Sequence, residues 1–203
     1  MANIISIFRI FLVFIAISLL MLKPSNIAYL SALILTILAF SLDGLDGYIA
    51  RKFNETSKLG AVLDIMGDRI AEYAYWIVFS CLGFIPVVFP LIAITRGVVT
   101  DSLRSVALEQ GYIPFGKGSM LNDKVSQWIC GSKFMKIGYA VVKALAFSLI
   151  IIANSPIIYN SLKYCWHVSV VANVLSEIAI LVCVIRGIPV LFESRRFLNK
   201  GTD

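Results

Sequence analysis

The chain is dominated by apolar runs that are long enough to cross a lipid bilayer. They can be placed at residues 8–22, 26–50, 60–83, 86–107, 136–153 and 168–192. A spanning helix needs about 20 apolar residues, and fewer when it ends at the interface. The runs are too long for strands and lack the two-residue alternation of strands. The sequence therefore predicts an all-α integral membrane protein with six transmembrane helices.

Composition agrees with this prediction and excludes an ordinary soluble domain. Hydrophobic residues make up 59% of the 203 residues and charged residues 15%, whereas soluble domains contain about 25% charged residues. The length suits a single transmembrane domain over residues 1–203. The net charge of +6 is typical of basic cytoplasmic loops and of contact with anionic lipid, so no nucleic-acid partner is expected.

The distribution of lysine and arginine predicts the orientation. If the N-terminus is cytoplasmic, the outer loops hold only Lys23 and Lys163, while the inner loops and the adjoining helix ends hold most of the other cations. Positive charge collects on the cytoplasmic side of membrane proteins. We therefore expect both termini and the 51–59 loop to be cytoplasmic, in the plasma or inner membrane. Residues 1–9 are expected to form a short interfacial segment, with Arg9 as an anchor at the headgroups.

An acidic motif straddles the loop between the second and third expected helices. Asp43 and Asp46 lie three residues apart, and Asp64 and Asp68 lie four residues apart. Both spacings put the paired acids on one face of a helix. Antiparallel packing of the two helices would bring four carboxylates together, and these repel one another unless a cation lies between them. Carboxylate oxygens favour Mg²⁺ or Mn²⁺ over zinc.

Small residues and an arginine narrow the kind of ligand. Gly47, Ala50 and Gly60 have almost no side chain, so a bulky ligand can approach the helix backbones there. Arg51 adds a fixed cation that can contact a phosphate. Together with the acids, these residues predict a site for a pyrophosphate or a nucleotide diphosphate. A small cation channel or transporter is the alternative of a different class, because acids at membrane depth can also line an ion path.

These residues also match a known signature. The pattern reads Asp43-x2-Asp46-Gly47-x2-Ala50-Arg51-x8-Gly60-x3-Asp64-x3-Asp68. It resembles the signature of the CDP-alcohol phosphatidyltransferase family at every specified position. The resemblance implies transfer of a phosphatidyl group from CDP-diacylglycerol, or from a CDP-linked ether lipid, to a small polar alcohol, with release of CMP.

The resemblance further implies a role for each residue of the motif. Two divalent cations, Mg²⁺ or Mn²⁺, would be held by the four acids Asp43, Asp46, Asp64 and Asp68. The cytidine diphosphate would be contacted by Asp46, Gly47, Ala50, Arg51 and Gly60. Asp68 would also act as the catalytic base toward the acceptor hydroxyl. The family further implies a membrane-lipid environment and a homodimer.

A second group of cations bears on the acceptor. Arg96 and Arg104 belong to the fourth expected helix, and Lys117 and Lys124 follow them. A phosphorylated alcohol needs such cations to bind its phosphate, whereas free serine does not. The stretch from Arg96 to Gly111 is similar to the corresponding part of bacterial phosphatidylglycerophosphate synthases. This similarity implies glycerol 3-phosphate as the acceptor.

Other acceptors stay open at this point. The last two acids stand in the sequence Asp64-Ile-Met-Gly-Asp68-Arg69, where phosphatidylglycerophosphate synthases usually carry Asp-Pro-Val-Ala-Asp-Lys. An arginine after the final acid looks more like the inositol-phosphate synthases. Inositol phosphate and serine are therefore the alternatives to glycerol 3-phosphate. Three further charges inside the expected helices, Lys143, Glu177 and Arg186, are expected to pair with one another within the bundle.

Overall fold

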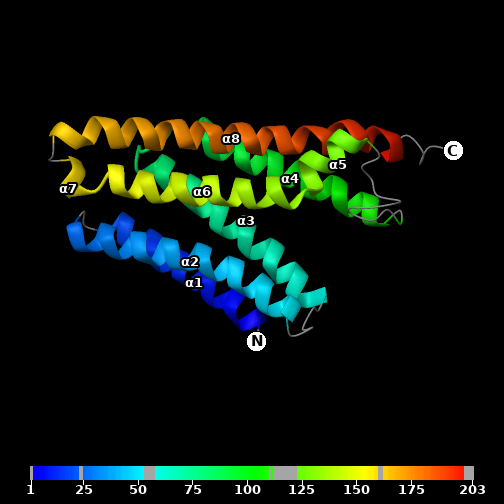
Figure 1. The fold of residues 1–203 in the computed structure, drawn as a ribbon, viewed down its shortest axis with the longest axis horizontal. Helices are drawn as coiled ribbons and strands as arrows, with labels where there is room; N and C mark the ends of the chain where they lie inside the picture. The colour runs from blue at the N-terminus through cyan, green and yellow to red at the C-terminus, as the bar shows by residue number, and fades with distance from the viewer. Residues whose placement is uncertain are drawn as a thin grey trace. The chain divides into compact units, whose positions relative to one another are not determined.

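The computed structural model describes residues 2–22, 25–52, 58–109, 111, 123–159 and 162–198. Throughout this part of the chain the backbone is helical apart from short turns, as Figure 1 shows. The helices are α1 (Ala2–Met21), α2 (Asn26–Lys52), α3 (Lys58–Cys81), α4 (Val88–Glu109), α5 (Lys124–Gly131), α6 (Lys133–Ala153), α7 (Pro156–Tyr159) and α8 (Leu162–Leu198).

Each apolar run coincides with a helix, and the structure adds two short helices that the apolar pattern did not predict. These are α5 and α7, of 8 and 4 residues. Helix α1 begins at Ala2, so the residues expected to form a separate interfacial segment are the first turns of α1. The expected interfacial stretch thus leads into α1 without a break, and its place at the interface stays a prediction. The apolar residues of this stretch continue directly into the run that follows, and nothing in the sequence interrupts the helix.

Three stretches of the described helices are long and apolar enough to cross a membrane. They are Asn26–Gly44, Lys133–Ala153 and Trp166–Arg195. The apolar stretch of α1, Ile5–Met21, is shorter than a full span. Helices α3 and α4 fall outside this group, and both carry charged residues of the predicted site, such as Asp68 and Arg96. The all-helical fold is thus confirmed for the described residues, three of whose helices could cross a membrane, while the number of six spans stays a prediction.

Contacts divide the chain into two compact units. Unit 1 comprises Met1–Pro90 and Ala144–Ser176, and unit 2 comprises Leu91–Lys143 and Glu177–Asp203. Helices α4, α6 and α8 contribute residues to both units. The acidic motif thus belongs to unit 1, and the cations assigned to the acceptor belong to unit 2.

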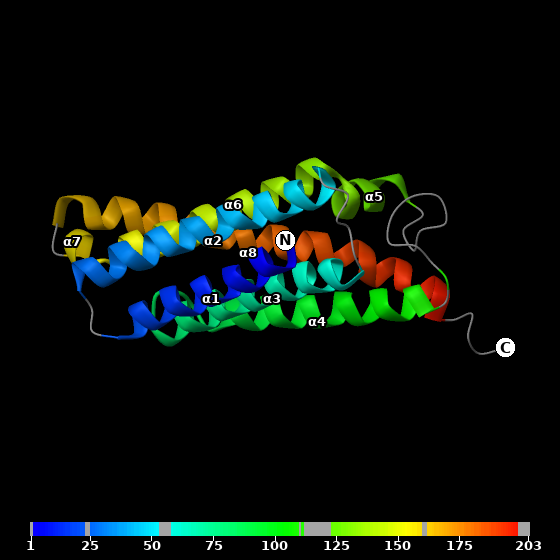
Figure 2. The same cartoon turned by 90° about the horizontal axis from the view of Figure 1, so that it is seen from below.

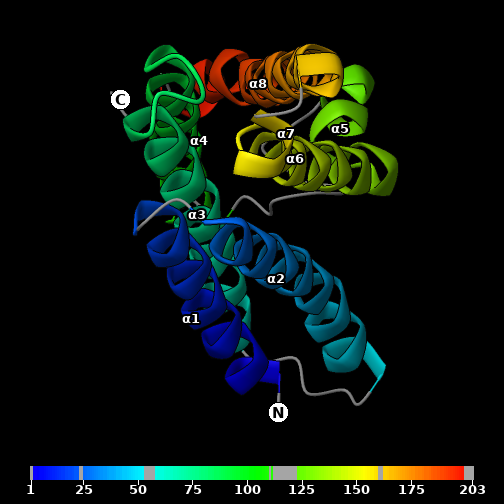
Figure 3. The ribbon, with the colours of Figure 1, turned by 90° about the vertical axis from the view of Figure 1, so that its left-hand side faces the viewer.

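The core of unit 1 is a cluster of aromatic rings. Phe147 of α6 lies at its centre, with ring centroids of Tyr75 at 5.2 Å, Trp76 at 4.8 Å and Phe79 at 5.5 Å, all from α3. Phe40 of α2 lies 5.9 Å from the same ring. Tilted and edge-to-face pairs of this kind stabilise a core beyond the area they bury. Helix α1 packs against α2 and α3, as Figure 3 shows.

A buried hydrogen bond joins the two helices that carry the acids. The hydroxyls of Thr36 in α2 and Tyr75 in α3 are 2.7 Å apart. Thr36 donates its own proton to the carbonyl of Ala32, at 2.7 Å, so Tyr75 is the donor to Thr36. This bond helps to set the register of α2 against α3, and with it the relative height of the acids on the two helices.

Unit 2 is built from α4, α5 and parts of α6 and α8. Ala107, Cys130 and Val190 are buried together and join α4, α5 and α8. Figure 2 shows α4 and the C-terminal part of α8 side by side. The start of α5 is fixed by Glu193 of α8, whose carboxylate accepts a hydrogen bond from the backbone N–H of Asp123 at 3.2 Å. A carboxylate at a helix N-terminus is favourable because the first N–H groups lack partners within the helix.

Candidate active site

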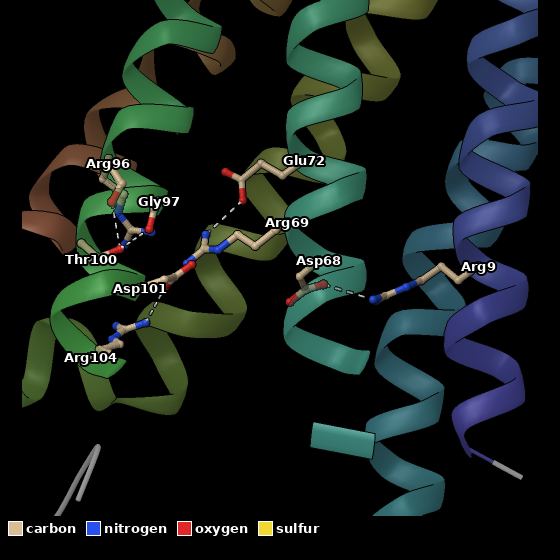
Figure 4. Close-up of polar contacts among 9 residues, drawn as sticks. All are labelled: Arg9, Asp68, Arg69, Glu72, Arg96, Gly97, Thr100, Asp101 and Arg104. Atoms are coloured by element: carbon tan, nitrogen blue, oxygen red, sulfur yellow. Dashed lines mark hydrogen bonds and ion pairs between the residues drawn. The ribbon is translucent and has the colours of Figure 1, made fainter. Parts of the chain in front are cut away.

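The first and last acids of the motif converge on a single side chain. In unit 1, Nη1 of Arg9 forms an ion pair with Oδ1 of Asp43 in α2 and lies 3.3 Å from Oδ1 of Asp68 in α3. Figure 4 shows Arg9 of α1 reaching toward Asp68. The spacing argument had placed these two acids on facing helices, and the structure brings them together around one positive charge.

Arg9 is not the headgroup anchor that its position near the N-terminus suggested. Only 2% of the residue is exposed, because α1 packs against α3 beside Gly67. A Cβ atom at position 67 would lie 2.6 Å from Nη2 of Arg9, so a larger residue there would require the end of the arginine side chain to shift. Two of its nitrogens, Nε and Nη2, are buried without a hydrogen-bond partner in the described part of the chain.

The other residues of the motif are described to different extents. Asp64 is exposed on α3, Gly60 is half-buried near its start, and both make polar contacts. Four motif residues lie in the last turns of α2, but their side chains are outside the described residues: Asp46, Gly47, Ala50 and Arg51. The structure therefore leaves the assignment of the nucleotide contacts a prediction.

The described acids can be tested for their fit to a divalent cation. No group of three or more His, Cys, Asp or Glu side chains lies close enough to hold a metal ion among the residues that the structure describes. Asp43 and Asp68 nevertheless each direct an oxygen at the same cationic nitrogen. An all-carboxylate set of this kind suits a hard divalent ion. The chemistry of the four predicted acids thus suits such an ion, but the described acids do not by themselves form a site for one.

Arg69, which follows the last acid, is held by a neighbour on its own helix. Its Nη1 lies 3.7 Å from Oε2 of Glu72, one turn further along α3. Glu72 is buried, with 3% exposure. A buried carboxylate needs a partner charge, so the pair gives Arg69 a structural role in addition to any contact with a substrate.

In unit 2, the charges of three arginines act on the thiol of Cys130. Burial raises the pKa of Cys130, and the positive charges of Arg104, Arg186 and Arg96 oppose this rise. Arg104 also forms an ion pair with Asp101, at 3.6 Å, as drawn in Figure 4. Two of these arginines, Arg96 and Arg104, are the residues that the sequence assigned to the acceptor phosphate.

Arg186 is a member of this group that the sequence analysis missed. Its guanidinium carbon lies 5.3 Å from the ring centroid of Tyr139, and Nζ of Lys143 lies 5.2 Å from the same ring. Its backbone carbonyl accepts a hydrogen bond from Cys130 Sγ, at 3.3 Å. Nε of Arg186 and Nε of Arg96 are both buried without a hydrogen-bond partner in the described chain. Unpaired charged donors of this kind favour an anionic ligand.

Arg96 also reaches a groove between α4 and α8. The groove has a volume of about 440 Å³, and its lining is apolar apart from Arg96, Thr95 and Thr100. Gly187 of α8 forms part of this lining, and a Cβ atom there would stand 2.9 Å from Cγ of Arg96. The glycine therefore sets how closely the arginine lies against α8.

The two lysines assigned to the acceptor are not tested by the structure. Lys117 lies outside the described residues. Lys124 is the first residue of α5, and its side chain is not described. The sequence did contain a signal for Arg186. This arginine lies inside an apolar run and is followed by Gly187, the glycine against which Arg96 packs.

Comparison with known proteins finds the same family that the acidic motif resembles. The profile of the family described as "CDP-alcohol phosphatidyltransferase" matches residues 1–185. The chain is 27% identical over 124 residues to a CDP-diacylglycerol–glycerol-3-phosphate 3-phosphatidyltransferase of Bacillus subtilis (strain 168), covering 61% of each chain. A protein of the same name from Wigglesworthia glossinidia brevipalpis is 34% identical over 117 residues, 52% of this chain and 59% of the relative.

A relative that is named for another acceptor matches a shorter stretch. CDP-diacylglycerol–inositol 3-phosphatidyltransferase 1 of Arabidopsis thaliana is 38% identical over 47 residues, 23% of this chain and 21% of the relative. The chain thus spans about 60% of the length of the two glycerol-3-phosphate relatives, 61% and 59%. The family match covers nearly all of the chain, including every residue of the acidic motif. On this evidence the chain belongs to the CDP-alcohol phosphatidyltransferase family.

Proposed function

We propose that this protein transfers the phosphatidyl group of CDP-diacylglycerol to glycerol 3-phosphate, which yields phosphatidylglycerophosphate and CMP. One observation carries the proposal. Asp43 of α2 and Asp68 of α3, the two ends of the family signature, both contact the guanidinium of Arg9. The names of the Bacillus and Wigglesworthia relatives support the choice of substrates.

The donor is assigned to the residues of the acidic motif. This family is generally dependent on divalent metal ions. Two such ions, Mg²⁺ or Mn²⁺, would be held by the four acids Asp43, Asp46, Asp64 and Asp68. They would supply stabilisation of the charge that builds on the attacked phosphorus and on the leaving CMP. The nucleotide is contacted by Asp46, Gly47, Ala50, Arg51 and Gly60, whose small residues let it approach the backbone.

Asp68 has the properties of the base for the acceptor hydroxyl. Its side chain is 51% exposed, so an acceptor can reach the carboxylate, while Arg9 holds one of its oxygens. A carboxylate close to the reacting hydroxyl can take its proton as the new phosphate ester forms.

The acceptor phosphate is assigned to the cations of unit 2. Arg96, Arg104 and Arg186 supply planar guanidinium groups, and the buried Nε atoms of Arg96 and Arg186 lack partners in the described chain. A phosphate oxygen satisfies such donors better than a neutral hydroxyl does. Lys117 and Lys124 complete this set. Free serine has no phosphate for these residues, and inositol phosphate is the acceptor that competes most closely with glycerol 3-phosphate.

The protein carries out this reaction as an integral membrane enzyme. Three described helices support membrane insertion by length and composition, and α1, α3 and α4 complete a set of six spans. The distribution of lysine and arginine supports cytoplasmic termini and an active site that opens to the cytoplasm. The homodimer that is common in this family also remains part of the proposal.

An acceptor panel tests the proposed function. The purified protein in phosphatidylcholine nanodiscs is given CDP-diacylglycerol, Mn²⁺ and one of glycerol 3-phosphate, inositol phosphate, inositol or serine, and CMP release is measured. We expect CMP release with glycerol 3-phosphate and little with the unphosphorylated alcohols. Faster release with inositol phosphate would reassign the acceptor. No release with any alcohol, together with cation flux in liposomes, would overturn the enzyme assignment in favour of a channel.

A further inference from the structure

The ring of Tyr139 in α6 contacts two cationic side chains of unit 2. The guanidinium carbon of Arg186 lies 5.3 Å from the ring centroid, and Nζ of Lys143 lies 5.2 Å from it. The tyrosine is buried, with 7% exposure. A cation within about 6 Å of an aromatic ring is attracted by the negative charge of the ring face, and the attraction strengthens where water is excluded. The ring is therefore an electrostatic partner of both cations as well as a part of the core.

A ring and a carboxylate hold an arginine in different ways. Arg104 has a carboxylate partner, because its Nη1 lies 3.6 Å from Oδ1 of Asp101. A carboxylate takes up N–H donors of the arginine that it pairs with, whereas the face of a ring attracts the charge and leaves the N–H groups in the guanidinium plane available. Nε of Arg186 is indeed buried without a hydrogen-bond partner in the described part of the chain. The side chain is thus held in place while a donor stays available to a ligand.

The backbone of Arg186 is held by a third helix, and a second arginine lies beside it. The carbonyl of Arg186 accepts a hydrogen bond from Sγ of Cys130 in α5, at 3.3 Å. Arg96 of α4 packs against Gly187, the residue that follows Arg186, and its Nε is also buried without a hydrogen-bond partner among the described residues. Two unpaired cationic donors from α4 and α8 therefore lie in the same region of unit 2.

We propose that Tyr139 is a positioning residue for the acceptor phosphate and acts through Arg186. Its ring holds the guanidinium in place and leaves Nε of Arg186 available to a phosphate oxygen, as Nε of Arg96 is. This inference rests on the proposed function, because it concerns the phosphate of the same acceptor. It adds to the acceptor site a neutral residue of α6 that itself contacts no substrate.

A role in packing alone predicts a different response to fluorine. Fluorine atoms on a phenyl ring hardly change its shape, but they withdraw electrons from its face. If Tyr139 only fills space, fluorination at position 139 should leave acceptor binding unchanged. If the ring attracts Arg186, each added fluorine weakens its hold on the guanidinium, and acceptor binding should weaken in steps. The response to fluorination therefore separates the two roles without removing any side-chain volume.

The test is equilibrium binding of radiolabelled glycerol 3-phosphate to the full chain in phosphatidylcholine nanodiscs. Mn²⁺ and CDP are present, and CDP has no phosphatidyl group to transfer. The variants are Tyr139→Phe and the same substitution with one, two or three fluorines on the ring, introduced by nonsense suppression. We expect Tyr139→Phe to bind like the wild type. The dissociation constant should then rise with each fluorine, to about tenfold with three.

Two controls show whether the effect passes through Arg186. In Arg186→Gln the cation is gone, so the fluorine series should change the dissociation constant less than about twofold. The same fluorines at Phe134, a residue of α6 with 76% exposure, should have no effect. A flat series at position 139, or a series of equal size in Arg186→Gln, overturns the proposal. If Arg186→Gln binds too weakly to measure, the series in the wild-type background decides by itself.

Kinetics of the same variants separates this inference from the proposed function. We expect the KM for glycerol 3-phosphate to follow the fluorine series while the KM for CDP-diacylglycerol changes little. If CMP is released but neither binding nor this KM responds to fluorination at position 139, the role of Tyr139 fails and the proposed function stands. If the wild type neither binds glycerol 3-phosphate nor releases CMP with it, the proposed function fails, and this inference fails with it.

Discussion

Arg96 of α4 lies against the backbone of Gly187 in α8, where a Cβ atom would stand 3.3 Å from Nε of the arginine. The same Nε is buried without a hydrogen-bond partner in the described chain. The glycine thus lets a long cationic side chain lie flat on a helix and keeps its donor near the place where an anion is proposed to bind.

Replacement of Gly187 by alanine should impair the acceptor site selectively. The added methyl group displaces Arg96, so we expect the KM for glycerol 3-phosphate to rise about tenfold while the KM for CDP-diacylglycerol changes little. Gly138→Ala is the matched control, because a Cβ at position 138 meets nothing within 4 Å. Equal kinetic effects of the two alanines would contradict the role of Gly187.

The arginines of unit 2 should act on one substrate more than on the other. We expect Arg96→Ala, Arg104→Ala and Arg186→Ala each to raise the KM for glycerol 3-phosphate more than that for CDP-diacylglycerol, since only the acceptor phosphate is assigned to them. Steady-state CMP release with each substrate varied in turn measures this. If both KM values rise equally, these residues do not form the acceptor site.

The acids of unit 1 should be required for turnover. Asp43→Asn, Asp64→Asn and Asp68→Asn each remove a charged ligand, and we expect CMP release to fall by more than about a thousandfold. Glu177→Gln is an isosteric control at an exposed acid of α8 and should keep wild-type activity. Near-normal turnover by any of the three aspartate variants would remove that residue from the metal site.

Loss of the hydrogen bond between Thr36 and Tyr75 should destabilise the protein more when Thr36 is replaced than when Tyr75 is replaced. Thr36→Val leaves the Tyr75 hydroxyl buried without an acceptor, which costs about 1–3 kcal/mol. Tyr75→Phe should cost about 1 kcal/mol, because the hydroxyl of Thr36 still donates to Ala32. The free energy of unfolding in mixed micelles tests this order. Ser41→Ala removes an exposed hydroxyl that bonds only to the preceding turn and should have little effect.

The thiol of Cys130 should react slowly and only at high pH. Burial raises the pKa of Cys130, so little thiolate is present near neutrality and the reaction with maleimide should accelerate as the pH rises toward the raised pKa. Exposed Cys81 is the reference, each thiol being measured in a variant that retains only that cysteine. Equal labelling rates at neutral pH would contradict the packing of α5 on α4 and α8.

The positions of the helices could be predicted from the sequence because apolar runs and helix periodicity are local properties. Asp43 and Asp68 were assigned to facing stripes from their spacing alone, and the structure brings their oxygens to one nitrogen. The register that achieves this depends in part on Thr36 and Tyr75, whose pairing no local pattern reveals. The side chains of Asp46 and Arg51 lie outside the described residues, so their roles stay predictions.

The cations were predicted less well because their partners are distant in the sequence. Arg9 resembled an interfacial anchor, since positive charge near an apolar N-terminus commonly lies at the headgroups. Its burial follows from the packing of α1 on α3, which brings Gly67 beside it. Arg186 resembled a charge that pairs within the bundle, and its place near Arg96 depends on Gly187. For Arg186 the adjacent Gly187 was the available signal.

The separation of 59 positions between Arg9 and Asp68 has a consequence for biosynthesis. Helix α1 leaves the ribosome before α2 and α3, so its buried cation precedes both of its counter-ions. Asp43 emerges next with α2, and Asp68 follows only when α3 has been made. The charge of Arg9 is therefore compensated in two steps as the nascent chain lengthens, and a chain that is released after α2 lacks the second carboxylate.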